Sequence, residues 1–175
     1  LIRGDRLPAN QLKFEGAPIT SCERFLWVGL SFLPSSLLLG VTAHITADIA
    51  SAPLLWVVPL AIYLLSFIVT FARRPPISHA LMVRLLPILL ILLVVLDSSI
   101  AGLPTARLPV WLLLLLHLGC FFVITLVCNG ELARRRPAAE HLTEFYLLLA
   151  VGGALGGIFN ALLAPLLFPG VWEYP

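Results

Sequence analysis

The sequence predicts an all-α, polytopic integral membrane protein with about five transmembrane helices. Of its 175 residues, 60% are hydrophobic and 11% are charged, and the mean hydropathy is +1.03. Soluble domains carry roughly 25% charged residues, and a soluble core of this size would leave large apolar patches on its surface. The apolar residues also gather into five runs, each near the ~20 residues that cross about 30 Å of hydrocarbon.

The chain divides into a polar segment and an apolar module. Residues 1–23 are mixed and aperiodic, and we expect them to be a linker or a tail from an upstream region. Residues 24–175 form the predicted transmembrane module. The first residue is Leu, and no signal-peptide pattern precedes the first apolar run. We therefore expect this chain to be an internal piece of a longer protein.

The first two predicted spans are interrupted by proline. Residues 25–42 contain Pro34, which removes a helical hydrogen bond and predicts a kink. The hydroxyls of the two serines that follow can satisfy the carbonyls that the proline frees. Residues 53–71 contain Pro59, which predicts a second kink.

The other three spans are predicted at residues 80–100, 108–128 and 142–168. Arg84 and Asp97 lie near the two ends of the third span, where a long side chain such as that of Arg84 can extend to the interface. The fifth span is long enough to begin in the interface or to tilt.

Positive charges are distributed unequally between the two sides of these spans. One side carries ten of the eleven lysines and arginines, and the other carries only Arg107. The ten are Arg3, Arg6, Lys13, Arg24, Arg73, Arg74, Arg84, Arg134, Arg135 and Arg136. Because cytoplasmic loops carry the excess of positive residues, the N-terminus is predicted to be cytoplasmic and residues 43–52 extracytoplasmic.

The motif GGALGG in the fifth span predicts a helix-packing groove. Gly152, Gly156 and Asn160 recur at four-residue spacing, as do Gly153 and Gly157. Small residues at this spacing let a neighbouring helix approach closely, and Asn160 can bond across to it. A site where a ligand approaches the backbone is the alternative interpretation.

His117 is the ionisable residue nearest the middle of a predicted span. Ionisable groups at this depth usually face the bundle interior or a cavity. At about 100° per residue, Glu131 lies within roughly 40° of His117, so the two share a stripe unless Gly130 ends the helix. The other interpretation is a neutral histidine bonded to a carbonyl on an adjacent helix.

The stretch CNGELARRRP follows at residues 128–137. Its three arginines indicate topology and also suit a contact with anionic lipid. Glu131 can pair with one of these arginines, and Glu144 at the start of the next span can act in the same way.

The stretch VTAHITADIASAP, residues 41–53, contains His44 and Asp48, which share a helix face if the first helix extends that far. Such a pair suits a proton relay, half of a metal site, or a mutually satisfied pair at the interface. Two ligands alone do not make a zinc site.

Motifs of soluble enzymes and of nucleic-acid binding do not occur. The sequence has no phosphate-binding loop, no G-x-S-x-G and no H-E-x-x-H, so no catalytic residue is named. The cysteines Cys22, Cys120 and Cys128 match no zinc spacing, and no metal site is predicted. No nucleic-acid partner is expected.

Three stretches together resemble the membrane region of bacterial fused spermidine synthase-like proteins. They are LPSSLLLGVTAHITADIASAPLLWVVPLAIYLLSF, CNGELARRRPAAEHLTEFYLLLAVGGALGGIFNALLAPLLF and the closing WEYP. The resemblance covers about residues 25–175. In that family a multi-span region precedes a cytoplasmic Rossmann-like domain of aminopropyltransferase or methyltransferase type, and some members are labelled transporter-like fusions. One position departs from the family, which usually has His before GEL where this chain has Asn129.

The resemblance implies a membrane module that anchors, or feeds substrate to, a transferase domain absent from this chain. An S-adenosylmethionine-type ligand would bind in that domain, so no cofactor is expected here. The implied location is the bacterial inner membrane. The expected partners are the lipid bilayer and other transmembrane helices of the same chain, and a homo-oligomer is left open.

Two other functions stay open. A permease for a small solute would place His44, Asp48, His117 and Asn160 along one water-accessible path. An intramembrane enzyme would bring His44 and Asp48 together with Glu131, although the predicted topology separates them by about 30 Å.

Overall fold

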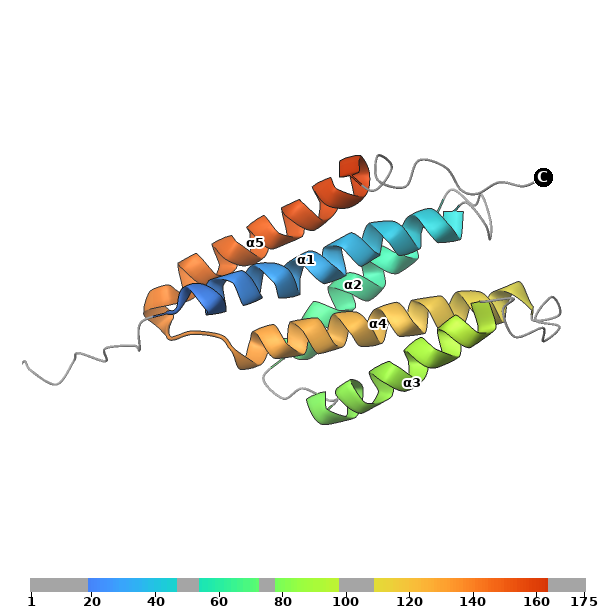
Figure 1. Cartoon of the computed structure of the whole chain (residues 1–175), viewed down its shortest axis with the longest axis horizontal. Coiled ribbons are helices and arrows are strands. Elements are labelled where there is room, and N and C mark those ends of the chain that lie inside the picture. Colours follow the sequence, from blue (N-terminus) through green and yellow to red (C-terminus); the bar gives the residue numbers. More distant parts are fainter. Residues whose placement is uncertain (1–18, 47–53, 73–77, 98–108, 164–175) are drawn as a thin grey trace, which may run out of the picture.

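The computed structural model describes residues 19–46, 54–72, 78–97 and 109–163. In these ranges the chain is helical, and no strand occurs among them (Figure 1). The all-α prediction is confirmed for this part of the chain. The helices are α1 (Ser21–His44), α2 (Val57–Thr70), α3 (His79–Asp97), α4 (Val110–Arg134), the short η4 (Ala139–His141), α5 (Leu142–Ile158) and the π-helical turn η5 (Phe159–Leu163).

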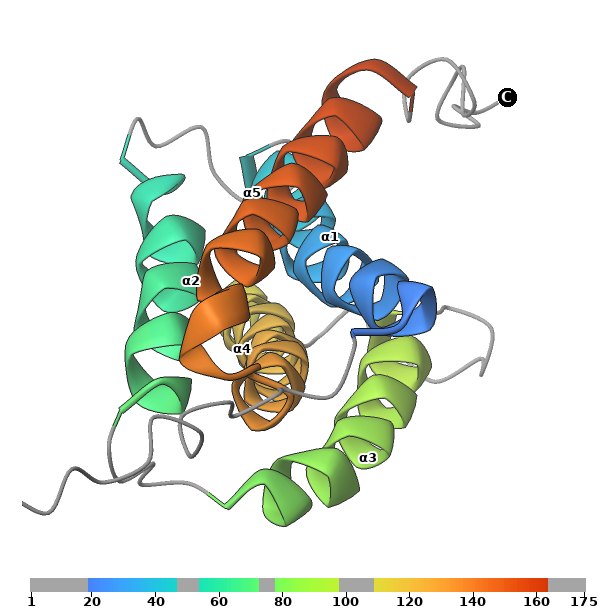
Figure 2. The same cartoon turned by 90° about the vertical axis from the view of Figure 1, so that its left-hand side faces the viewer.

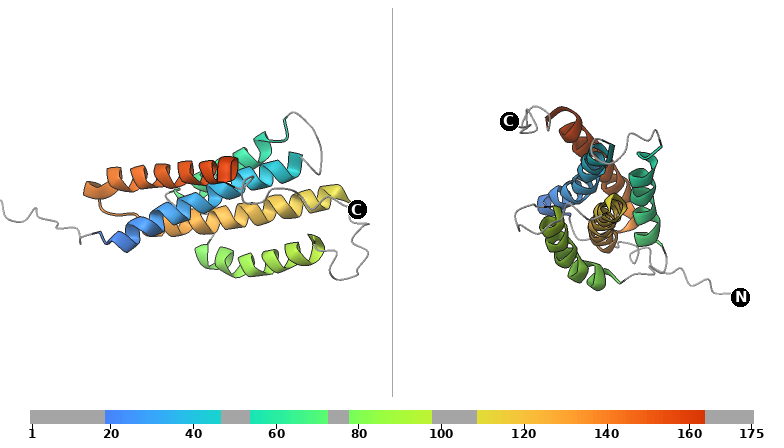
Figure 3. Two further views of the ribbon diagram at one scale, coloured as in Figure 1. Left: turned by 45° about the horizontal axis from the view of Figure 1, so that its top comes forward. Right: turned by 90° about the vertical axis from the view of Figure 1, so that its right-hand side faces the viewer.

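The helices run alternately up and down the bundle. α1, α3 and α5 begin at the end where α2 and α4 finish (Figure 1). Figure 2 shows α4 in the middle, in contact with α1, α2 and α3. α5 packs mainly on α1, and this is the most extensive contact between any two helices described. α3 lies on the outside of the bundle against α4 (Figure 3).

Three helical stretches are long and apolar enough to cross a membrane. They are Ser21–His44, Trp111–Arg134 and Ala139–Leu163. α2 and α3 are apolar but shorter, and the 14 residues of α2 rise only about 21 Å. The outer surfaces carry large apolar side chains such as Leu64, Ile88 and Leu147, which are exposed. The membrane character of the fold is therefore present, with three spanning helices in the described residues where five spans were predicted.

Two helices extend beyond their predicted boundaries. α1 begins at Ser21, inside the predicted linker, because Thr20 and Glu23 form a capping box that satisfies the first backbone N–H groups. α4 continues to Arg134 rather than stopping at residue 128, and Gly130 lies inside it. A glycine in a helix interior is tolerated when neighbouring residues such as Leu132 are buried.

The prolines act differently from one another. Pro34 lies inside α1, within the first predicted span, and is buried. The kink predicted at Pro59 is wrong, because Pro59 is the third residue of α2, where a missing N–H removes no interior helical hydrogen bond. The interior proline that was not considered is Pro87, and α3 is bent along its length (Figure 3).

Candidate functional site

Every arginine and glutamate in the described ranges lies at one end of the bundle, which we call the charged end. They stand at the starts of α1, α3 and α5, at the end of α4, or in the connection from α4 to α5. They are Glu23, Arg24, Arg84, Glu131, Arg134, Arg135, Arg136, Glu140 and Glu144. Asp97 ends α3 at the opposite end. A bundle that gathers its arginines and glutamates at one end and is apolar along its length fits one membrane interface at that end.

Glu131 is the centre of a polar cluster at the charged end. Its carboxylate lies 2.5 Å from Nε of Arg135 one turn later and 3.4 Å from Nε2 of His79 on α3. Glu131 thus pairs with one of the neighbouring arginines. Glu144, which was also expected to pair with one of the three consecutive arginines, instead lies 2.6 Å from Nε of Arg24. This ion pair joins the starts of α5 and α1.

His79 is pressed against the backbone of α4. A Cβ atom at Gly130 would lie only 2.7 Å from Nδ1 of His79, so glycine at this position makes room for the imidazole. Nδ1 is buried and has no hydrogen-bond partner among the described residues. A buried polar atom of this kind is destabilising unless a ligand or water completes it.

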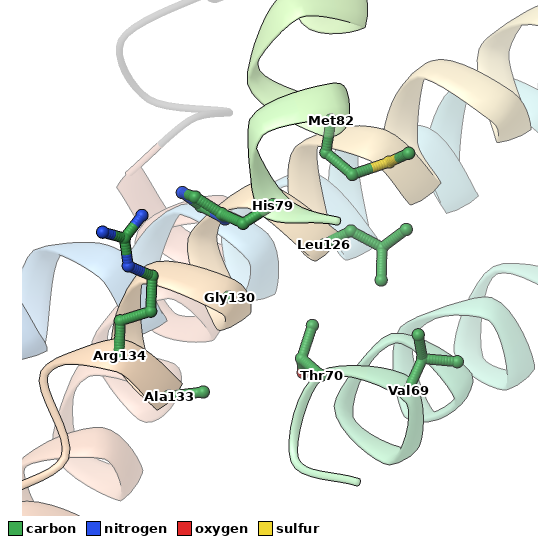
Figure 4. A pocket seen from close by; sticks show the side chains of 8 residues that line it. All are labelled: Val69, Thr70, His79, Met82, Leu126, Gly130, Ala133 and Arg134. Carbon is green, nitrogen blue, oxygen red and sulfur yellow. The ribbon is translucent and has the colours of Figure 1, made fainter. Parts of the chain in front are cut away.

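A cavity of about 260 Å³ opens beside His79 between α2, α3 and α4. Figure 4 shows the imidazole of His79 and the guanidinium of Arg134 on one side of it, and Met82 and Leu126 on another. Val69, Thr70, Gly130 and Ala133 complete the lining. The cavity can hold a small amphipathic group, with its polar part towards the charged end.

A buried polar contact joins α2 to α4 one turn away from this cavity. Asn129 and Ser66 are both fully buried, and Nδ2 of Asn129 donates a hydrogen bond of 2.9 Å to Oγ of Ser66. Ser66 in turn donates to the carbonyl of Tyr63. Oδ1 of Asn129 has no partner among the described residues. Asn129 therefore orients α2 on α4 and offers one free buried acceptor.

The glycines of α5 divide into two sets. A Cβ at Gly152 would meet the carbonyl of Val28, and a Cβ at Gly156 would lie 2.5 Å from the carbonyl oxygen of Phe32. Side chains do not fit at such distances, so these two glycines let the backbones of α1 and α5 meet. A Cβ at Gly153 or Gly157 would meet no atom within 4 Å. The close approach therefore involves one of the two glycine rows.

Hydrogen bonds continue this contact along α1. Oγ of Ser35 donates to the carbonyl of Gly153 at 2.8 Å, and Nδ2 of Asn160 donates to both the carbonyl and the hydroxyl of Ser36. The two serines after Pro34 were expected to satisfy carbonyls of their own helix. Ser35 bonds to the backbone of α5 instead, which the glycines bring within reach, and the hydroxyl of Ser36 accepts from the side chain of Asn160 in η5.

His44 and His117 lie against each other at the end opposite the charged end. Their ring centroids are 4.9 Å apart, with the planes inclined by 36°. Nδ1 of His117 lies 2.8 Å from the carbonyl oxygen of Leu113, which can only accept, so Nδ1 carries the hydrogen. This carbonyl belongs to the same helix, not to an adjacent one. Asp48 lies outside the described residues, so its pairing with His44 stays a prediction.

The candidate residues do not converge on a single site. His117 and Glu131 are both in α4, and their separation of 14 positions corresponds to about 21 Å of helix. His117 faces His44 on α1, whereas Glu131 faces His79 on α3. His44 and Glu131 therefore lie in two separate parts of the bundle.

Metal binding finds no support in the described ranges. They contain no group of three or more histidine, cysteine, aspartate or glutamate side chains placed to hold a metal ion. Cys22 is exposed, Cys120 and Cys128 are buried, and all three are free thiols.

Sequence reasoning missed three residues at the charged end. His79 begins α3 and was not considered, although a histidine at the start of an apolar run is a detectable signal. Ser66 is a single serine within the apolar run of α2, and it is buried where it accepts the hydrogen bond from Asn129. Trp27, fully enclosed beside Phe145, gives no signal beyond that of an interfacial aromatic.

Comparisons with known proteins give no further identification: no family model, no curated protein and no solved structure matches this chain.

Proposed function

We propose that this chain is the membrane module of a spermidine synthase-like fusion protein, which holds a transferase domain at the cytoplasmic face of the bacterial inner membrane. The observation that carries the membrane half is the gathering of every described arginine and glutamate at one end of an apolar bundle. The excess of positive charge supports a cytoplasmic location for that end. The transferase half rests on the sequence resemblance.

The charged end is where such a domain would receive or release substrate. The cavity beside His79 and Arg134 lies at that end, between α2, α3 and α4. We infer that the module both anchors the domain and offers it an amphipathic binding space. An S-adenosylmethionine-type ligand belongs to the domain and not to this chain.

The test is an assay of the full-length protein that contains this chain. Membranes from expressing cells are washed at alkaline pH, and the retained protein is purified. It is then supplied with putrescine and decarboxylated S-adenosylmethionine, and separately with a methyl acceptor and S-adenosylmethionine. Retention in the washed membrane together with aminopropyl or methyl transfer supports the proposal, and a protein without either transfer activity contradicts the transferase half.

A permease is the second candidate, favoured by the contact between His44 and His117. Asn160 lies 4.0 Å from the Cβ position of Gly40, so Gly40 and His44 on α1 approach Asn160 and His117 in succession. Of the four residues expected along a solute path, His44 is in α1, and His117 and Asn160 both lie next to α1. Asp48, the fourth, lies outside the described residues.

Uptake into proteoliposomes distinguishes this candidate from the first. Radiolabelled spermidine serves as the probe, and His117→Phe keeps an aromatic ring against His44 while removing the titratable nitrogen atoms. Uptake by the wild type that is lost in the variant supports a permease. No uptake above protein-free liposomes contradicts it and leaves the anchoring function in place.

A further inference from the structure

A second cavity, of about 490 Å³, lies at the charged end on the other side of α4. It is enclosed by the start of α1, the end of α4 and the connection from α4 to α5. Its walls include Ile19, Trp27, three consecutive arginines (Arg134, Arg135, Arg136) and His141. Arg134 lines both this cavity and the cavity of Figure 4. Arg135 and Arg136 line this cavity and not the other.

The charge of this cavity is positive. Among the described residues of its lining, Glu23 alone carries a carboxylate, and its Oε2 already accepts hydrogen bonds from the backbone and hydroxyl of Thr20. Arg135 is engaged by Glu131, and the guanidinium of Arg136 lies 5.9 Å from the ring centroid of Tyr146. With Arg135 paired to Glu131, the lining still has Arg134 and Arg136 against the capped carboxylate of Glu23. This excess of positive charge favours an anion, and arginine forks match phosphate oxygens in pairs.

Trp27 provides an independent observation. Its side chain is 2% exposed, packs edge-on against Phe145 at 5.1 Å, and lines the cavity. Its indole N–H is buried and has no acceptor among the described residues. Since a buried donor without an acceptor is destabilising, an acceptor oxygen held in the cavity would stabilise the bundle.

We propose that this cavity binds the phosphate group of an anionic phospholipid. Basic pockets between transmembrane helices on the cytoplasmic side bind anionic head groups, and Trp rings favour the head-group level. Ile19 in the wall and the exposed Phe25 and Leu147 at the same end give acyl chains an apolar surface. The site depends on placement of the bundle in a membrane and is independent of any transferase activity.

The experiment measures lipid association directly. The full chain is reconstituted into phosphatidylcholine nanodiscs that contain spin-labelled phosphatidylglycerol as a minor component, and electron paramagnetic resonance gives the immobilised fraction. The reference is spin-labelled phosphatidylcholine. We expect phosphatidylglycerol to be immobilised preferentially, and Arg136→Gln to weaken its association about fivefold.

Two further variants separate a site from diffuse attraction. Trp27→Phe removes the N–H but keeps an aromatic ring against Phe145, and it should weaken association about threefold or more. Arg84→Gln removes an exposed arginine of α3 outside the cavity and should leave association unchanged. If Trp27→Phe does not fold, the comparison of Arg136→Gln with Arg84→Gln still distinguishes a binding site from diffuse attraction.

Three outcomes would overturn the proposal. The first is equal immobilisation of phosphatidylglycerol and phosphatidylcholine by the wild type. The second is an equal loss in Arg84→Gln and Arg136→Gln, which would mean long-range attraction without a site. The third is displacement of the spin-labelled lipid by an equimolar amount of inorganic phosphate, which would mean that the cavity takes the free anion and not the lipid.

Discussion

The contact between α1 and α5 includes a close approach of backbone atoms and hydrogen bonds between the helices, in addition to side-chain packing such as that of Trp27 on Phe145. The contact between α3 and α4 has no such backbone approach among the described residues and consists mainly of apolar side chains beside a cavity. Gly152 and Gly156 lie directly on carbonyls of α1, and Asn160 bonds to Ser36. On the other side, Met82 packs with Val123 and Leu126. In a bilayer, lipid tails are as apolar as Leu, so apolar side chains alone hold helices together less specifically than close backbone packing.

The difference suggests that the two sides of the bundle have different roles. The α1–α5 pair is the more rigid side, because its close backbone contact leaves no room for a side chain at Gly152 or Gly156. The α2–α3–α4 side keeps space at the charged end, where His79 and Arg134 line a cavity. Binding is therefore expected at the charged end, in the cavity of the α2–α3–α4 side and in the cavity between the start of α1 and the end of α4. A structural role is expected for the glycine contact of the α1–α5 pair.

Gly152→Ala should have the largest effect on stability. The added Cβ would meet the carbonyl of Val28, so α1 and α5 would have to separate, at a cost of about 3 kcal/mol. This loss of stability is measured as the decrease in the free energy of unfolding in mixed detergent micelles. Gly153→Ala is the matched control, since its Cβ meets no atom within 4 Å and alanine favours the helix. Equal losses in the two variants would contradict the assignment of the packing face.

Asn160→Leu should have the next largest effect. It removes the hydrogen bonds to the carbonyl and hydroxyl of Ser36 and should cost about 1 kcal/mol, in the range measured for polar contacts between membrane helices. The same unfolding assay applies. Ser36→Ala leaves the carbonyl acceptor in place and should cost less, so a larger loss in Ser36→Ala would argue against this geometry.

Ala133→Leu tests the other side of the comparison. Ala133 lines the cavity of about 260 Å³, and a larger apolar side chain there has room to extend. We expect the unfolding free energy to change by less than about 1 kcal/mol. A loss as large as that of Gly152→Ala would show that the α2–α3–α4 side is packed as closely as the α1–α5 pair.

Arg24→Gln should have the smallest effect. The ion pair with Glu144 joins α1 to α5 at the charged end, but both side chains are partly exposed. Exposed ion pairs contribute roughly 0–1 kcal/mol, so the variant should change stability by about 0.5 kcal/mol or less. A loss above that of Asn160→Leu would mean that charge, and not the glycine contact, holds the pair together.

The sequence predicted the class of the fold and the chemistry of the α1–α5 contact better than the position of any site. Glycine spacing identifies a packing face because helical periodicity is local, and Gly152, Gly156 and Asn160 follow it. Which of two glycine rows is used depends on the partner helix. Spacing alone therefore could not separate Gly152 from Gly153.

The candidate site residues required tertiary information. His44 and His117 are 73 positions apart in the printed sequence and meet because α1 crosses α4. His79 reaches Glu131 because α3 docks where Gly130 leaves space. Neither contact has a periodic signal in one segment. The cavities likewise arise between helices and are not encoded in any single run.

Labelling of Cys22 tests the central claim, a membrane bundle with its charged end in the cytoplasm. Cys22 is exposed at the start of α1, while Cys120 and Cys128 are buried, so a membrane-impermeant maleimide should react with Cys22 alone. We expect labelling in inside-out membrane vesicles and none in intact spheroplasts, with Cys22→Ser as the unlabelled control. Labelling of Cys22 in intact spheroplasts would contradict the claim.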